Sequence, residues 1–213
     1  NWDNTVSYQR DIGDHNVLVM LGTNTQDNWY FWVEGDKRGH LVNQAPVLSN
    51  VESNLDTLYA TGDFGKYDSR FSIFGRISYN YKEKYLMTAS LRRDGSSRFG
   101  KENRYGIFPA ISLGWTISEE SFMENITILD FLKLRGSWGS NGKEPTLRYQ
   151  YLATVSSTNR FYTFGQSEVG VSPNILANSS LKWEEAQQIN IGLDSRVYKN
   201  VRFTFDWYRK TSK

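Results

Sequence analysis

The chain contains no cysteine and only four prolines among its 213 residues. Without cysteine, neither a disulfide framework nor a thiolate metal site can form. The 25 basic and 23 acidic residues nearly balance, so the charge gives no reason to expect a nucleic-acid partner. No secretion signal is recognisable. Strand-like runs lie close to both ends of the chain, and we therefore expect both ends to be cuts within a longer protein.

Long hydrophobic runs are also absent. No segment reaches the roughly 18 apolar residues that a membrane-spanning helix requires. A barrel strand crosses a membrane with about 9–11 residues of alternating polarity, so this absence does not exclude a membrane protein. Aromatic residues reach 15% of the chain, whereas all hydrophobic residues together reach only 38%. Many aromatics among many polar residues favour strands with one apolar and one wet face.

Residues 71–81 show this alternation clearly. Every second position from Phe71 to Tyr81 is apolar or aromatic except Gly75, and the intervening positions are mostly polar and include Arg76. Successive side chains of a strand point to opposite faces, so these two sets would separate. The same plan recurs, and we expect about eight strands. They are residues 5–10, 16–22, 71–81, 85–92, 107–117, 132–135, 189–196 and 201–207.

The connections between the expected strands alternate in length. Short or medium links are expected at residues 11–15, 82–84, 118–130 and 199–200, and the link 118–130 begins like a helical turn. Long links are expected at residues 24–69, 95–104 and 139–183, with the strand-like segment 149–166 as an extension of the last one. Short periplasmic turns and long outer loops are typical of outer-membrane barrels. We predict an all-β fold, part of an antiparallel transmembrane β-barrel.

A soluble β-sandwich is the alternative, because its strands also alternate, with the apolar face inward. Two features favour the membrane. The runs 71–81 and 107–117 hold eleven residues each, whereas soluble strands usually hold about five or six. Tyrosine and tryptophan also gather near strand ends, where lipid headgroups would surround them. These aromatic residues are Tyr79, Tyr81, Tyr85, Trp115, Trp207 and Tyr208.

Three stretches resemble the SusC/RagA branch of TonB-dependent transporters. They are Leu91–Gly100 (LRRDGSSRFG), Asn103–Trp115 (NRYGIFPAISLGW) and Leu176–Glu184 (LANSSLKWE), the last followed by INIGLD at 189–194. Ser179-Ser180 stand where family members usually show Pro-Asp or Pro-Asn. The order and spacing of the stretches are also similar, from about Tyr8 to the end of the chain.

This resemblance implies a barrel of about 22 strands that encloses a plug domain. Such barrels lie in the bacterial outer membrane of Bacteroidetes and import glycans or peptides. The implied partners are a SusD-like lipoprotein, which captures ligand, and TonB with ExbB and ExbD, which supply energy through an N-terminal segment. Residues 1–213 match only part of the barrel domain, about eight strands, without plug or TonB-contacting segment. We expect this fragment to need the rest of its barrel.

Candidate chemistry is sparse. His15 and His40 are the only histidines, and we expect the first to make a turn hydrogen bond and the second to lie exposed in a loop. The pairs Glu119-Glu120 and Glu184-Glu185 are sequence neighbours, which cannot face each other across a sugar as glycosidase carboxylates do. A phospholipase would need a Ser–His pair near the bilayer edge. We predict no enzyme, no metal site and no cofactor.

Two sets of aromatic residues could contact ligand. Trp29, Tyr30, Phe31 and Trp32 follow one another in the first long link, and sugar rings stack on such side chains. Phe161 and Tyr162 in the third long link share this interpretation. The alternative for both sets is packing onto the barrel rim or a partner protein. A soluble carbohydrate-binding β-domain that uses the first set is the second candidate function.

Charged residues on the polar side of the strands would line the lumen. In the structural interpretation, these residues form a solvated ion-pair lining between barrel and plug. In the functional interpretation, they contact the passing substrate directly. The expected lining residues are Arg76, Arg92, Lys133, Arg135, Asp194 and Arg196.

Overall fold

The computed structural model describes residues 1–37, 58–126, 128–156, 161–163, 167–169 and 172–212. The chain divides into two compact units. The first comprises Asn1–Gln26 and Arg70–Lys213, and the second comprises Asp27–Ser69. Each unit is described by itself below.

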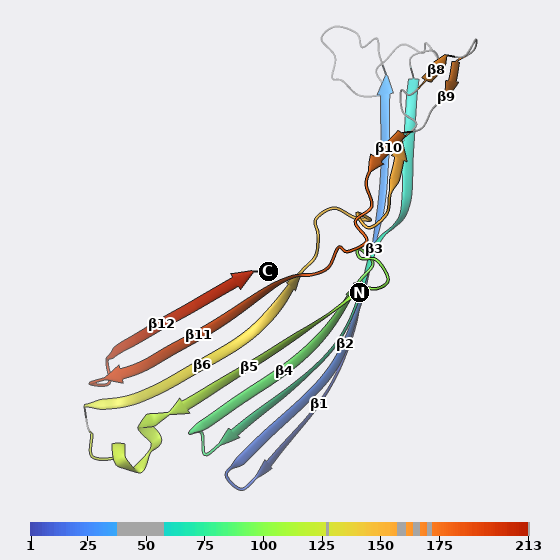
Figure 1. The fold of residues 1–213 in the computed structure, drawn as a ribbon. Coiled ribbons are helices and arrows are strands. Elements are labelled where there is room, and N and C mark those ends of the chain that lie inside the picture. The colour runs from blue at the N-terminus through green and yellow to red at the C-terminus, as the bar shows by residue number, and fades with distance from the viewer. Residues whose placement is uncertain (38–57, 127, 157–160, 164–166, 170–171, 213) are drawn as a thin grey trace, which may run out of the picture. The chain divides into compact units, whose positions relative to one another are not determined.

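Eight strands form one antiparallel sheet in the order β1-β2-β3-β4-β5-β6-β11-β12 (Figure 1). This confirms the all-β class and the number of long strands. The strands run further than the alternation predicts. Their bounds are β1 Trp2–Ile12, β2 His15–Lys37, β3 Leu58–Tyr81, β4 Tyr85–Ser96, β5 Tyr105–Thr116, β6 Leu129–Lys143, β11 Glu184–Val197 and β12 Val201–Ser212.

The short connections lie together at one end of the sheet, which we call the turn end, and the opposite end is the loop end (Figure 1). Gly13 has φ +58 between β1 and β2, as a tight hairpin turn requires. The link between β5 and β6 contains two 3₁₀ turns, η2 Ile117–Glu119 and η3 Ser121–Met123. Among the described residues, no helix is long and apolar enough to span a membrane.

The long connection between β6 and β11 carries short strands. β7 Thr154–Ser156 pairs with β10 Ser172–Ile175, and β8 Phe161–Thr163 pairs with β9 Ser167–Val169. Within the described residues, the strand-like segment predicted at 149–166 contains two short strands, β7 and β8. It lies outside the eight-stranded sheet, as its expected place in a loop requires.

Cross-strand register sorts the side chains into an apolar face and a polar face. Ile111 lies opposite Ala89 of β4 and Trp138 of β6, whereas Ser112 lies opposite Thr88 and Ser137. Members of the apolar face stay uncovered along several strands. The exposed fractions of Ile73, Leu113, Ile191 and Phe205 lie between 46% and 56%.

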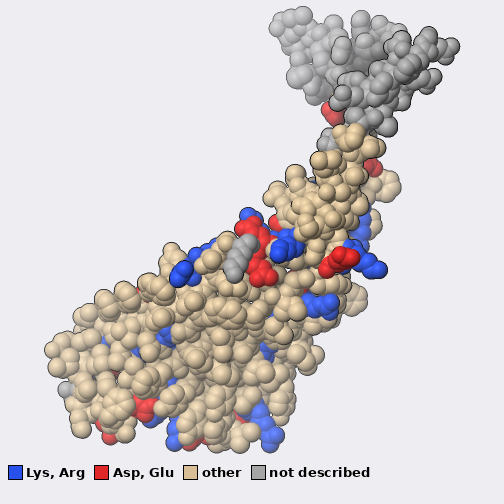
Figure 2. All heavy atoms as spheres, viewed as in Figure 1, with Lys and Arg blue, Asp and Glu red and all other residues tan. Residues whose placement is uncertain are grey.

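No closed core forms between two sheets in the part of the chain that the structure describes. There, Phe99 and Phe108 are the only buried hydrophobic residues. A soluble sandwich would instead bury the apolar face, so this alternative does not describe the structure. Figure 2 shows Lys, Arg, Asp and Glu gathered mainly toward the ends of the strands of the first unit.

Aromatic residues gather at the turn end of the apolar face. The Tyr81 and Tyr85 rings stack with centroids 6.2 Å apart, and the His15 ring lies 4.6 Å from that of Tyr81. Trp207 and Tyr208 do not fit the expected placement. β12 continues to Ser212, so these two residues lie near the middle of the strand. Only Trp207 shares the apolar face, opposite Ile191.

Candidate functional site

The polar face carries a three-strand ion-pair cluster. Arg135 of β6 places Nε 2.9 Å from Asp194 Oδ2 on β11 and Nη2 2.7 Å from Asp206 Oδ1 on β12. Gly192 lies opposite Arg135 in the register. A Cβ at Gly192 would approach Arg135 Cζ to 2.6 Å, so the glycine leaves room for the guanidinium between its two carboxylates.

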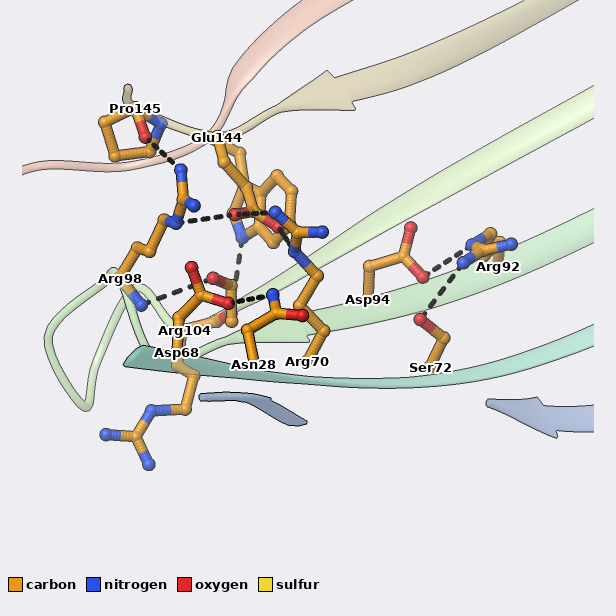
Figure 3. A network of polar contacts seen from close by, with 12 residues as sticks. Asn28, Asp68, Arg70, Ser72, Arg92, Asp94, Arg98, Arg104, Glu144 and Pro145 are labelled. Carbon is orange, nitrogen blue, oxygen red and sulfur yellow. Dashed lines mark hydrogen bonds and ion pairs between the residues drawn. The ribbon is translucent and has the colours of Figure 1, made fainter. Parts of the chain in front are cut away.

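Arg92 anchors a second cluster nearer the loop end. Its Nε lies 2.6 Å from Asp94 Oδ1, and its Nη2 donates to Ser72 Oγ at 3.1 Å (Figure 3). The guanidinium also lies 5.6 Å from the centroid of the Phe74 ring, close enough for a cation–π contact. Phe74 reaches over Gly22, where a Cβ would meet its ring at 2.4 Å.

At the loop end, the Glu144 carboxylate binds side chains both from the sheet and from a connecting link (Figure 3). Arg70 Nη2 donates to Glu144 Oε2 at 3.2 Å, while Arg70 Nε lies 2.7 Å from Oε1 without hydrogen-bond alignment. Arg98 Nε lies 3.3 Å from Oε2, and Arg98 Nη1 donates to the Pro145 carbonyl at 3.0 Å. One mostly buried carboxylate therefore binds arginines from β3 and from the β4–β5 link.

An aromatic cluster accompanies this ion pair. The Trp183 ring lies 4.8 Å from that of Phe99 and 5.5 Å from that of Phe108, between centroids. Phe99 is fully buried. Trp183 Nε1 also donates to the Arg104 carbonyl at 3.3 Å. This cluster was missed as a site from the sequence, although Phe99 and Trp183 both lie in the stretches that carry the family resemblance.

Three of the six expected lining residues have no carboxylate partner among the described residues. Arg76, Lys133 and Arg196 lie on the polar face, as Arg92, Arg135 and Asp194 do. No ion pair there includes any of these three cations. The six expected lining residues thus share one face but not one role.

The four consecutive aromatics belong to the second unit, where they lie in β2 rather than in a loop. This corrects the expected placement and changes its meaning, because alternate residues of a strand point to opposite faces. Trp29 and Phe31 share one side and are 69% and 78% exposed. On the other side, the Tyr30 hydroxyl donates to Asp63 Oδ2 at 2.7 Å and its ring lies 5.5 Å from that of Tyr67.

The remaining candidates are placed only in part. The backbone of Phe161 and Tyr162 lies in β8, but the placement of their side chains is not described. His40 lies outside the described residues. His15 opens β2, and its Nδ1 lies 2.8 Å from the Tyr79 hydroxyl, so its hydrogen bond joins two strands. Among the described residues, no group of three or more His, Asp or Glu side chains could hold a metal.

Glu120 is the most connected carboxylate of the turn end. It accepts from the Tyr85 hydroxyl at 2.5 Å and from Trp115 Nε1 at 3.0 Å. Lys84 Nζ lies 3.6 Å away. These partners favour the charged form, so the hydrogen bond from Tyr85, followed by that from Trp115, lowers the pKa of Glu120.

Comparison with known proteins identifies close relatives of known class. Residues 1–213 match the family model described as TonB dependent receptor-like, beta-barrel. The chain is 38% identical over 213 residues to TonB-dependent receptor P39 of Formosa agariphila, covering 99% of this chain and 20% of that protein. It is 34% identical over 215 residues to TonB-dependent receptor SusC of Bacteroides thetaiotaomicron, covering 97% and 20%. These relatives are receptors by name rather than enzymes.

A solved structure shares the fold. The RagAB peptide transporter matches with a TM-score of 0.84 and 24% identity, covering 99% of this chain and 23% of that one. At this identity, the likeness concerns the fold alone. The chain spans about a fifth of the length of the curated relatives that it matches.

Proposed function

This chain belongs to the TonB-dependent receptor-like β-barrel family, and we propose that it forms part of the wall of an outer-membrane transporter. The whole transporter would import glycans or peptides with energy supplied through TonB, ExbB and ExbD. A SusD-like lipoprotein would capture the substrate. The plug and the TonB-contacting segment would belong to the rest of the protein, because the chain spans only a fifth of its relatives.

The uncovered apolar face carries this proposal. A sheet in water would leave this large apolar surface exposed at a cost of roughly 25 cal/mol for each Å². Lipid tails remove that cost, and the aromatic group at the turn end suits the headgroup level. Arg10, Arg93 and Arg209 also lie on this face, and each lies within four residues of an end of its strand. Near a strand end, a long side chain reaches headgroups or water.

The polar face would then line the lumen. Arg135 with its two carboxylates and Arg92 with Asp94 would form a charged, hydrated wall against the plug. Arg76, Lys133 and Arg196 would contribute cations that have no carboxylate partner among the described residues. A direct role in substrate passage would fall to Arg76 before the paired residues, because a paired guanidinium must first give up its carboxylate.

Ligand contact by aromatic side chains is a finer part of the proposal. Trp29 and Phe31 are the two most exposed of the four consecutive aromatics and would offer one stacking surface. Tyr30 is held by Asp63 and would contribute less. Phe161 and Tyr162 remain candidates in the connection between β6 and β11.

The direct test uses the complete transporter in its own outer membrane. Uptake of labelled oligosaccharides and of labelled peptides is measured in cells with and without TonB, and the lipoprotein is sought by affinity purification. The proposal expects an outer-membrane location, a co-purified lipoprotein, and uptake of one substrate class that stops without TonB. TonB-independent uptake, or a protein found only in soluble fractions, would refute it.

A further inference from the structure

Two arginines face each other at the turn end of the polar face. Arg196 of β11 and Arg202 of β12 are direct cross-strand partners in the register. Both side chains are exposed. Like charges at directly opposite positions destabilise an antiparallel pair. The pairing therefore needs a compensating anion, or it weakens the hairpin that ends at the turn after Val197.

The described residues do not supply that anion. Asp194 and Asp206, two acidic neighbours on this part of the face, both bind Arg135, and Asp130 of β6 accepts a hydrogen bond from the backbone nitrogen of Lys199 in the turn. Asp194 also lies opposite Lys133 on β6 and Thr204 on β12 in the register. No ion pair in the described ranges includes Arg196 or Arg202. Near this hairpin, the polar face thus carries four cations, which are Lys133, Arg135, Arg196 and Arg202. Its two carboxylates, Asp194 and Asp206, already bind Arg135.

The surface between these groups is hollow. A depression of about 440 Å³ is lined by Phe131, Lys133, Asp194, Ser195, Arg196, Arg202 and Thr204. Its lining thus includes two guanidinium groups and one ammonium group. Guanidinium presents a planar fork of donors that matches a carboxylate in two-point contact. The hollow has the charge and the donors of a carboxylate site.

We propose that Arg196 and Arg202 together bind a carboxylate, and that this carboxylate belongs to an Asp or Glu of the same protein outside this chain. The inference rests on the proposed function, in which the polar face encloses the rest of the polypeptide. Most of the length of the relatives lies outside the matched region, so a large segment is available to fill the lumen.

The position of the pair favours a fixed protein partner over a passing substrate. Arg196 and Arg202 flank the short turn at residues 198–200, at the end of the sheet away from the long loops. A repulsive pair of this kind would need its counter-charge whenever the barrel is folded. A substrate is present only during transport and cannot meet that need.

Carbodiimide cross-linking of the complete transporter tests the site. Arg196→Lys and Arg202→Lys keep the charge and add a reactive amine, which joins covalently to a contacting carboxylate. We expect mass spectrometry to find position 196 or 202 linked to one Asp or Glu outside this chain. Arg10→Lys, at the turn end of the apolar face, is the matched control and should give no link outside the chain.

Two results would overturn the proposal. The first is the absence of links, or links to Asp194 or Asp206 alone. The second is a link to added hexaglutamate peptide in place of a link to the transporter itself, which would assign the site to substrate. Recovery of each variant in the outer membrane is scored separately. A variant that reaches the membrane without the link refutes this inference and leaves the transporter assignment standing.

Thermal unfolding of the complete transporter gives an independent readout. If one carboxylate serves both arginines, Arg196→Gln and Arg202→Gln should each lower the unfolding midpoint. The double variant should then fall little further, because the second change removes an interaction already lost. Arg76→Gln is the control, since Arg76 lies opposite Ser90 rather than another cation. A raised or unchanged midpoint in both single variants would contradict the proposal.

Discussion

The two faces of the eight-stranded sheet belong to the same strands but differ in how much they depend on specific contacts between residues. The apolar face consists of side chains that alternate in sequence and need no particular partner, since the hydrocarbon of the proposed membrane setting would solvate any of them. The polar face depends on individual contacts, such as that of Arg135 with Asp194 and Asp206. The alternation of residue types is therefore enough to specify the apolar face. The polar face also requires the register that brings particular charged residues together.

Phe99→Ala should lower the free energy of unfolding most. It tests whether the polar side of the sheet also depends on a packed apolar side chain. Phe99 is fully buried against Trp183, so dry packing as well as charge stabilises the loop end. Truncating a buried phenylalanine typically costs about 3–5 kcal/mol. We expect a loss of this order in chemical unfolding of the complete barrel, with the β4–β5 link opening first in hydrogen exchange. Phe122→Ala, at an exposed phenylalanine, is the control. Equal losses in both variants would remove Phe99 from the loop-end core.

Ile111→Arg and Ser112→Arg compare the two faces at neighbouring positions. An arginine on the lipid side near mid-bilayer should cost about 2–4 kcal/mol. On the polar face, the same side chain would lie near Thr88 and Ser137, in water. Unfolding free energies in lipid vesicles should therefore separate the two variants. Equal losses would show that the faces do not differ in their surroundings.

Glu144→Gln should have the next largest effect. The carboxylate is mostly buried and binds both Arg70 and Arg98, and a hydrogen bond to a charged group contributes about 1.5–3 kcal/mol. Glu184→Gln removes an exposed partner of Lys143, for which about 0–1 kcal/mol is expected. Unfolding in denaturant compares them. A larger loss at Glu184 would reverse the order of importance assigned to these ion pairs.

Glu120→Gln should have a small effect that depends on pH. The pKa of Glu120 is lowered in the folded protein, first by Tyr85 and then by Trp115. Its contribution is thus fully present above the unfolded pKa, near 4.5, and is lost as the pH falls through the lowered folded pKa. The unfolding midpoint of the parent should fall across this acidic range more steeply than that of the variant. Glu119→Gln is the control, and identical pH profiles for parent and Glu120→Gln would contradict the assignment.

Much of the sheet is predictable because a period of two residues has a direct structural meaning. Residues 71–81 alternate cleanly, and β3 contains them all. The extension of β2 to Lys37 is not predictable in this way, because residues beyond Gly22 lose the alternation. The second unit, Asp27–Ser69, does not repeat the alternation of apolar and polar residues. The sequence therefore predicts a long link there and not strands.

Residue partners on the polar face are harder to predict than the face itself. Arg135 and Asp194 were both expected there, but their pairing requires the register between β6 and β11, which are far apart in the sequence. Trp183 contacts Phe99 for the same kind of reason, since a long connection returns to the sheet beside the β4–β5 link. The alternation of residue types does not predict the register between β6 and β11. It also does not predict the path that brings Trp183 to Phe99.

Spin labels placed along β5 in the complete protein, reconstituted in lipid, test the two-faced wall most directly. Positions 107 to 115 are substituted by cysteine one at a time, and accessibility to oxygen and to a water-soluble nickel complex is recorded. Labels at Ile107, Ile111 and Leu113 should favour oxygen, and those at Ala110, Ser112 and Gly114 should favour nickel. Equal accessibility at odd and even positions would contradict a wall with lipid on one side and water on the other.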